Sequence, residues 1–207
     1  MKVYMILFEF DEETPFFPIK RFKEIHDVQI NLPIIQDELI ENKVWLRWGS
    51  DTYDQSGHCQ FLSGNWTVFP IYFGNYSGHG MEVSAGLTLE QREQILDSLP
   101  IRFPKTTALL KHFSSINFVA LSRLHPHSDL APHRHNNPLS FICHLGLIIP
   151  AEEQCGLKVK DQTFIWKKPG DGIVFNDNLE HSAWNHSNEE RIILYIDFRR
   201  PLETFKK

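Results

Sequence analysis

The sequence predicts a single domain, residues 1–207, that is mainly β: a double-stranded β-helix of the jelly-roll, cupin-like kind with a few helices packed on one face. From residue 116 onward, short segments rich in β-branched and aromatic residues alternate with turns. Aromatic residues make up 13% of the chain, and flat rings pack well on pleated sheets. The helical patterns fall earlier. We therefore expect residues 1–115 to supply helices and supporting strands, and residues 116–200 to form the jelly-roll core.

The first part of the chain begins with residues 2–9, which can form a strand. Residues 31–43 carry a helical stripe of apolar side chains, with Asn31 as the expected cap and Pro33 in the first turn. Residues 45–57 are polar and aromatic, and we expect a loop there.

Three further elements are expected before residue 116. Residues 65–74 are typical of a strand, and a proline near its end places it at a sheet edge, because proline cannot donate a ladder hydrogen bond. Residues 88–99 begin with a threonine followed three residues later by a glutamine, a capping box that predicts a helix. Residues 103–113 predict a shorter helix with a proline at its start.

The second half of the chain is expected to hold strands joined by short turns. The strand patterns cover residues 116–124, 139–149, 156–160, 162–166, 172–175 and 191–198. Turn signals separate them at residues 126–132, 136–138, 169–172 and 185–190.

Charge and cysteine content narrow the partners and the location. The net charge is −5 and there is no basic stripe, so nucleic acid is not an expected partner. No apolar run approaches the roughly 20 residues of a membrane span, so no membrane partner is expected either. The three cysteines, Cys59, Cys143 and Cys155, lack a CxxC spacing, which indicates a reducing compartment. Residues 1–10 fail as a signal peptide, and we expect a cytoplasmic protein.

Histidines concentrate between residues 122 and 150, a composition typical of a metal site. His133 and His135 are one residue apart, so on an extended chain both side chains project to the same face. His181 follows His135 by 46 residues, after a turn-and-strand pattern. In a jelly roll this spacing of a few strands and turns returns the chain to the same end of the barrel. Two histidines with an optional third ligand leave open positions on a metal, which fits redox iron. His125 and His127 flank a proline and are expected to be turn residues.

Arg191 begins a strand in which Arg191, Ile193, Tyr195 and Asp197 share one face. Both faces are largely apolar, so an inward arginine would need an anionic partner, since an unpaired buried charge is very costly. A ligand carboxylate could be that partner, held bidentately. The alternative is that Arg191 marks the end of the strand and points to solvent.

Several blocks of the chain together resemble one family, the aspartyl/asparaginyl β-hydroxylases, which are Fe(II)- and 2-oxoglutarate-dependent dioxygenases of double-stranded β-helix fold. Each block alone is a weak signal, but they follow the family's order and spacing from residue 65 to Arg191. The blocks are Asn65-Trp-Thr-Val-Phe-Pro-Ile-Tyr, Pro104-Lys-Thr-Thr-Ala-Leu-Leu, Ser122-x-Leu-His-Pro, His133, His144-Leu-Gly-Leu-Ile-Ile-Pro, Trp166-x-x-Pro-Gly-Asp, Phe175-Asn-Asp-Asn-Leu-Glu-His181, Trp184-Asn and Arg191.

The resemblance implies specific roles. His133 and His181 would bind iron, Ser122 and Arg191 would hold the distal carboxylate of 2-oxoglutarate, and His144 would meet the carboxylate nearer the metal. The implied activity consumes O2, converts 2-oxoglutarate to succinate and CO2, and hydroxylates an unactivated carbon. The expected substrate is an amino acid, free or as an Asp/Asn-type residue in a peptide, contacted by the aromatic-rich residues 45–76.

Two positions depart from the family pattern. His135 stands where members carry Asp or Gly; it could be a third metal ligand, or it could swing away and leave a two-histidine site completed by water, which its small polar neighbours favour. Ile142 stands where the peptide-hydroxylating members carry an arginine, and Arg123 or Arg134 could substitute. These departures leave an alternative function open: a non-catalytic protein that binds a metal or a small acid on the same fold.

Overall fold

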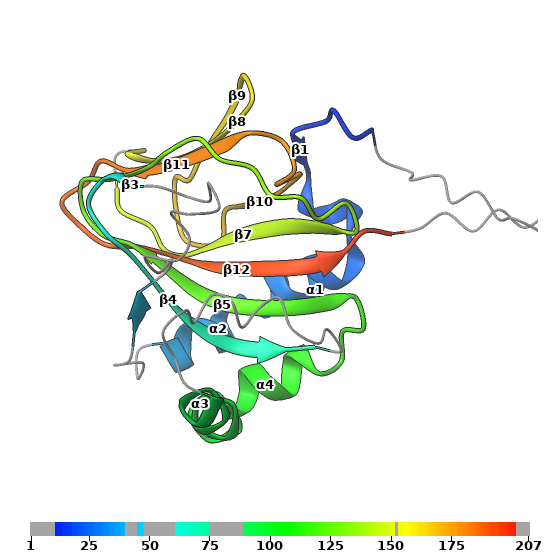
Figure 1. Cartoon of the computed structure of the whole chain (residues 1–207). Coiled ribbons are helices and arrows are strands. Elements are labelled where there is room, and N and C mark those ends of the chain that lie inside the picture. The colour runs from blue at the N-terminus through cyan, green and yellow to red at the C-terminus, as the bar shows by residue number, and fades with distance from the viewer. Residues whose placement is uncertain (1–10, 40–44, 48–60, 75–88, 152, 202–207) are drawn as a thin grey trace, which may run out of the picture.

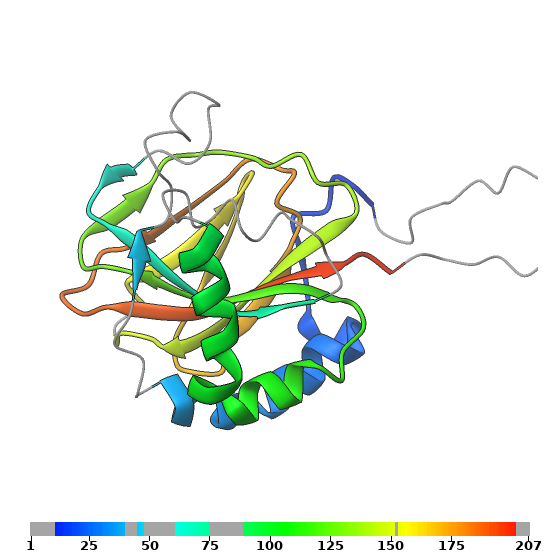
Figure 2. The ribbon, with the colours of Figure 1, turned by 60° about the horizontal axis from the view of Figure 1, so that its bottom comes forward.

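The computed structural model describes residues 11–39, 45–47, 61–74, 89–151 and 153–201. Two β-sheets face each other, and the helices cover the outer face of the larger one (Figures 1 and 2). The predicted fold, mainly β with helices on one face, is confirmed. Paired strands are antiparallel, as in a jelly roll, and many partners are far apart in the chain; β12, for example, pairs with β5 and with β7.

The larger sheet has the strand order β1-β10-β7-β12-β5-β4-β2, and the smaller one β3-β6-β11-β8-β9. The strands are β1 (Phe16–Phe17), β2 (Leu46–Arg47), β3 (Phe61–Ser63), β4 (Trp66–Phe73), β5 (Ile116–Leu124), β6 (Ser128–Leu130), β7 (Ser140–Ile148), β8 (Cys155–Val159), β9 (Gln162–Ile165), β10 (Gly172–Phe175), β11 (His181–Asn185) and β12 (Arg191–Arg199). The helices are a 3-10 turn (Ile19–Arg21), α1 (Lys23–Ile30), α2 (Leu32–Leu39), α3 (Leu89–Arg102) and α4 (Pro104–Leu110).

Strand β12 shows how the sequence separates two cores. Leu194 and Ile196 belong to the core under the helices, whereas Ile193 belongs to the core between the sheets. This is the period-two alternation expected for a strand buried on both faces. In the register of β12, Ile193 lies opposite Ser122 of β5 and Tyr195 lies opposite His144 of β7. Because cross-strand partners share a face, these side chains all face the smaller sheet.

The predicted helix at residues 31–43 corresponds to α2, which begins at Leu32 directly after Asn31 and has Pro33 in its first turn, as predicted. Asn31 also follows the last residue of α1, Ile30, so it lies between two helices. Its side-chain amide donates to the carbonyl of Asp27 at 2.8 Å, at the end of α1. Pro33 explains the break, because its ring has no N–H and clashes with the preceding turn of a continuous helix. Helix α1 itself was not expected from the sequence.

The other early elements follow the prediction more closely. Helix α4 begins at Pro104, as predicted. Helix α3 runs on to Arg102, beyond the predicted end. Strand β4 is not the outermost strand as predicted, because the two-residue β2 pairs with its Thr67 and Val68; at Pro70 no outer strand pairs with β4 among the described residues. The loop expected at residues 45–57 contains strand β2, and its residues after 47 lie outside the described residues. The Thr88 cap and the strand predicted at residues 2–9 also lie outside them. No helix in the described ranges is long and apolar enough to cross a membrane.

Candidate metal centre

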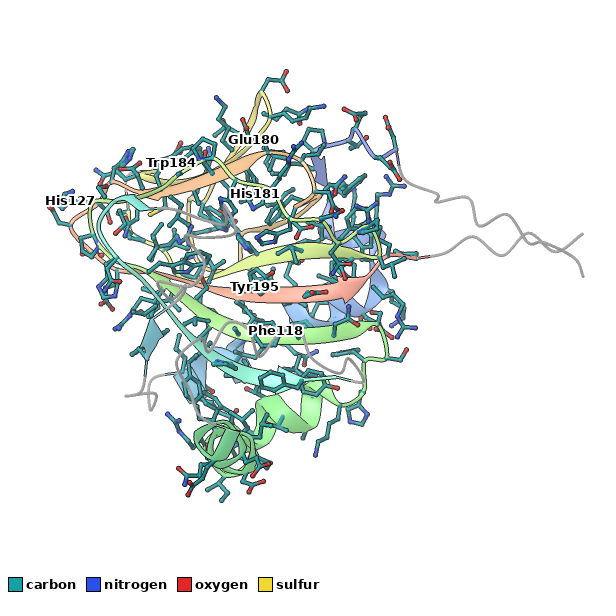
Figure 3. The ribbon with its side chains drawn as sticks, viewed as in Figure 1. Phe118, His127, Glu180, His181, Trp184 and Tyr195 are labelled. Carbon is teal, nitrogen blue, oxygen red and sulfur yellow. The ribbon has the colours of Figure 1, made fainter. Side chains whose placement is uncertain are left out.

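Three imidazoles meet at one end of the space between the sheets. His133 and His135 lie on the segment that joins β6 to β7. His181, which is labelled in Figure 3, is the first residue of β11. Nitrogen atoms from the three rings all lie within 4.8 Å of one another. The ring centres of His133 and His181 are 4.2 Å apart. Such a group can hold a divalent transition metal.

Main-chain hydrogen bonds fix the two histidine segments side by side. The N–H of His133 donates to the carbonyl of His181 at 2.9 Å, and the N–H of His181 donates back at 2.8 Å. The N–H of His135 donates to the carbonyl of Asp177 at 2.9 Å. His135 therefore lies with the other two rings and is not turned away from them, in contrast to the arrangement that its small polar neighbours favoured.

The hydrogen bonds of the three rings determine which nitrogen faces a metal. Nδ1 of His133 lies 2.9 Å from the carbonyl of Ala131, and Nδ1 of His181 lies 2.9 Å from that of Leu179. Nδ1 of His135 lies 3.0 Å from Oδ2 of Asp177. Each acceptor assigns the ring proton to Nδ1, which leaves the lone pair of each neutral imidazole on Nε2.

His181 is well suited to stay neutral. Burial lowers its pKa well below the usual 6.5, and the neighbouring His133 and His135 lower it further, against a raising effect of the Leu179 carbonyl. A metal binds the unprotonated imidazole, so a lowered pKa favours ligation near neutral pH.

A narrow cavity continues from the histidines into the space between the sheets. It has a free volume of about 30 Å³. Ser122, His144 and Arg191 all line it, so the three residues expected to bind the cosubstrate share one cavity with the three histidines. The remaining lining residues are Trp66, Leu130, Ile142, Leu157, Phe175, Asp177, Ala183 and Tyr195.

Arg191 is buried at the inner part of this cavity with only 1% of its surface exposed. This contradicts the alternative in which it points to solvent. Its Nε and Nη1 have no hydrogen-bond partner among the described residues. Burial lowers its pKa to about 10, so the side chain remains charged at neutral pH. An unpaired buried cation is costly, and a ligand carboxylate would supply the missing partner.

His144 and Ser122 add polar atoms near Arg191. Burial, followed by the charges of Arg191 and His181, lowers the pKa of His144 well below its usual value. Its Nδ1 has no hydrogen-bond partner in the described part of the chain. Ser122 accepts a hydrogen bond from Nε1 of Trp66 at 2.8 Å and keeps its own O–H as a donor. The donor set fits a carboxylate, but the small volume means that lining side chains must move to admit a five-carbon diacid.

Neither proposed substitute for the missing family arginine lines the cavity. Arg123 is in an ion pair with Glu190 at 3.3 Å and lies 4.2 Å from the centre of the Trp45 ring. Arg134 is exposed. Ile142 itself is 2% exposed and is one of the apolar lining residues. The idea that Arg123 or Arg134 replaces the family arginine is therefore wrong for this arrangement of the chain.

His125 and His127, the two histidines predicted to be turn residues, lie at the connection between β5 and β6. His127 has a positive φ of 53° in the turn between β5 and β6, and His125 precedes that turn. Neither lines the cavity. Asp177 and Tyr195 line it without having been assigned a role from the sequence. For Asp177 the available signal was its position four residues before His181.

Comparison with known proteins gives the family. The sequence profile of the aspartyl/asparaginyl beta-hydroxylases matches residues 29–201. The chain is 33% identical over 104 residues to the ornithine lipid ester-linked acyl 2-hydroxylase of Rhizobium tropici, covering 49% of this chain and 36% of that protein. It is 32% identical over 103 residues to the aspartyl/asparaginyl beta-hydroxylase of Mus musculus, covering 47% of this chain and 14% of that protein.

Solved structures match the chain with lower sequence identity than these relatives do. A predicted oxalate decarboxylase from Thermotoga maritima has a TM-score of 0.33 at 16% identity, covering 41% of this chain and 68% of that one. Likenesses of this size carry no functional argument. The profile match, by contrast, spans most of the chain and includes every histidine and arginine of the site. The chain belongs to the aspartyl/asparaginyl beta-hydroxylase family.

Proposed function

We propose that this protein is an Fe(II)- and 2-oxoglutarate-dependent dioxygenase that hydroxylates an amino acid, free or as an Asp/Asn-type residue in a peptide, with succinate and CO2 as co-products. The observation that carries the proposal is Arg191: a buried cation whose Nε and Nη1 have no hydrogen-bond partner among the described residues, in the same cavity as three converging imidazoles. A metal site alone does not explain such a cation. A dicarboxylate that reaches from the metal to Arg191 does.

His133, His135 and His181 would hold the iron through Nε2, as their Nδ1 contacts indicate. Bound iron would supply the activation of O2 that amino-acid side chains cannot provide. Three protein ligands leave positions for the cosubstrate and for oxygen.

The other residues would bind and orient the cosubstrate. Arg191 would pair with its distal carboxylate and Ser122 would donate a hydrogen bond to the same group. His144 would face the carboxylate nearer the metal as a neutral ring, in agreement with its lowered pKa. The apolar lining, which includes Ile142 and Leu157, would exclude water from the reacting groups.

The substrate class rests on the family. Relatives are named for the hydroxylation of aspartyl and asparaginyl residues and of an ornithine lipid, and the chain spans only part of each. We favour an amino acid or peptide, and we place the protein in the cytoplasm on its sequence alone. The narrow cavity of about 30 Å³ and Ile142 favour a second candidate, a non-catalytic binding protein for a metal or small acid.

The test is succinate formation from 2-oxoglutarate by purified protein under air with Fe(II) and ascorbate. It is run with and without a pool of free amino acids and short Asp/Asn peptides. Succinate that rises with one pool supports the dioxygenase, and His133→Ala should abolish it while His186→Ala, which alters an exposed surface histidine, should not. Binding of iron and 2-oxoglutarate without succinate under any pool would favour the binding protein instead.

A further inference from the structure

Asp177 is a buried carboxylate that faces one of the three histidines. Only 3% of its surface is exposed, and Oδ2 lies 3.0 Å from Nδ1 of His135. Its other oxygen, Oδ1, has no hydrogen-bond partner among the described residues. Burying a carboxylate is costly, and its contact with His135 and the nearby charge of Arg200 offset part of this cost.

The two residues next to Asp177 in the chain are anchored by side-chain hydrogen bonds. The side chain of Asn178 accepts from the N–H of Asn137 at 2.6 Å and donates to the carbonyl of Asn137 at 3.1 Å. Asn176 accepts from Nη2 of Arg200 at 2.7 Å and donates to the carbonyl of Glu12 at 2.7 Å. Asp177 therefore lies between two anchored residues, from which its carboxylate can orient the ring of His135.

The three histidines differ in the hydrogen-bond acceptor that their Nδ1 faces. Nδ1 of His133 and Nδ1 of His181 face neutral main-chain carbonyls, whereas Nδ1 of His135 faces a carboxylate. A carboxylate is the stronger acceptor and makes the opposite ring nitrogen a better donor to a metal. It also places a negative charge on the far side of the His135 ring from the metal. Three neutral imidazoles alone would not balance the charge of the metal.

We propose that Asp177 is a positioning residue that makes His135 a full third ligand, so that the metal is held by three imidazoles with the balancing carboxylate one ring away. The inference rests on the metal site of the proposed function and deepens it. It gives His135, which stands where family members carry Asp or Gly, the role of a metal ligand supported by Asp177.

The test measures Fe(II) affinity under anaerobic conditions and without 2-oxoglutarate, so that it does not depend on turnover. The proteins are the wild type, Asp177→Asn, His135→Ala and the double variant. We expect Asp177→Asn to weaken Fe(II) binding about 10- to 100-fold. In the His135→Ala background the same substitution should have no further effect, because the route through which Asp177 acts is gone. A merely structural role for Asp177 would give the same loss in both backgrounds.

Asp129→Asn is the matched control. Asp129 also pairs with a histidine, since Oδ1 lies 2.8 Å from Nε2 of His186, but this pair is on the surface and outside the cavity. The Asp129→Asn substitution should leave Fe(II) affinity unchanged. If Asp177→Asn does not fold, Asp177→Leu takes its place, because it removes the buried charge at similar volume.

The outcomes separate the two proposals. Unchanged affinity in Asp177→Asn, or an equal loss with and without His135, overturns the role of Asp177 and leaves the dioxygenase proposal standing. A wild type that binds no Fe(II) overturns the metal site and the proposed function with it. A loss that depends on His135 supports the role of Asp177 even if no succinate is formed.

Discussion

The guanidinium carbon of Arg191 lies 5.2 Å from the centre of the Trp166 ring, and both side chains are fully buried. A cation over an aromatic face is worth about 2 kcal/mol when it is desolvated. Removing a charge from water costs more than this, by several kcal/mol. Trp166 therefore offsets only part of the cost, and the fold keeps Arg191 in a state that an anion would improve.

The first prediction concerns Arg191→Met, which keeps a long side chain and removes the charge. The protein without ligand should become more stable by about 1–4 kcal/mol, because an uncompensated buried charge is lost. Affinity for 2-oxoglutarate should fall by about 1.5–3 kcal/mol, the value of a charge-assisted hydrogen bond. Urea unfolding and calorimetric titration measure the two effects.

Arg200→Met is the control for this prediction. Arg200 is also buried, but it donates to the carbonyl of Ser140 at 2.9 Å and to Asn176 at 2.7 Å. Its removal should destabilise the protein because these acceptors lose their donor. If both variants lose stability and Arg191→Met keeps its affinity for 2-oxoglutarate, Arg191 does not serve as an anion site.

The second prediction concerns the metal ligands. Fe(II) at 100 times its dissociation constant should stabilise the wild type by about 2.7 kcal/mol, because it binds the folded state. His133→Ala and His181→Ala should remove this stabilisation, and His186→Ala should keep it. Thermal unfolding with and without anaerobic Fe(II) measures the effect. Retention of bound iron by His133→Ala would exclude this cluster as the site.

The third prediction concerns pH. His144 and His181 have pKa values well below 6.5 in the folded protein because they are buried, whereas in the unfolded chain they titrate near 6.5. As the pH falls below about 6.5, the unfolded state binds protons first, so metal-free protein loses stability by up to about 1.4 kcal/mol per pH unit for each such histidine. Urea unfolding at pH 7.5 and pH 5.5 measures the loss.

His144→Phe provides the comparison, because a phenyl ring can keep the ring contacts with Phe175 and Trp166. Its loss of stability between the two pH values should be smaller than that of the wild type. An equal loss in both proteins would show that His144 does not contribute to the pH dependence.

The strands that could be predicted from the sequence are those whose own residues carry the pattern. Strands β5, β7 and β12 were predicted to within one or two residues, because long runs of buried side chains determine them. The two- and three-residue strands β1, β2, β3 and β6 were missed, since their pairing partners stabilise them and their own sequence does not. The five-residue strand β11 was also missed. Residues 126–132 were read as a turn, although β6 begins at Ser128.

The same distinction applies to the site. The resemblance to the family assigned Ser122, His144 and Arg191 to one ligand, and the fold brings them to one cavity. The contact between His135 and Asp177 joins residues 42 positions apart and does not follow from any local pattern. Small polar neighbours favoured a mobile His135, but a main-chain hydrogen bond to residue 177 and the carboxylate of that residue hold it.

The last prediction concerns Glu24 of α1, which joins the helices to the start of β5. It accepts hydrogen bonds from the N–H of Ser115 at 2.9 Å, from the N–H of Ser114 at 3.3 Å and from both hydroxyls. Burial raises the pKa of Glu24, but these hydrogen bonds together outweigh it and leave the pKa lowered. Its contribution to stability is therefore present above pH 4.5 and is lost as the pH falls through the lowered folded pKa.

Glu24→Gln should destabilise the protein by about 1–2 kcal/mol at pH 7, the lower part of the range for hydrogen bonds to a charged group, because Glu24 is only partly buried. The difference from wild type should shrink as the pH falls through the lowered pKa of Glu24, because the wild-type side chain then becomes neutral like that of glutamine. Glu153→Gln, which breaks an exposed ion pair with Lys167 at 3.1 Å, should change stability by less than about 1 kcal/mol. A Glu24 effect as small as that of Glu153, or one that does not change with pH, would show that this carboxylate does not anchor α1 to β5. None of the three metal-site histidines lies on α1 or β5, so the loss of this anchor should lower stability and leave Fe(II) affinity unchanged.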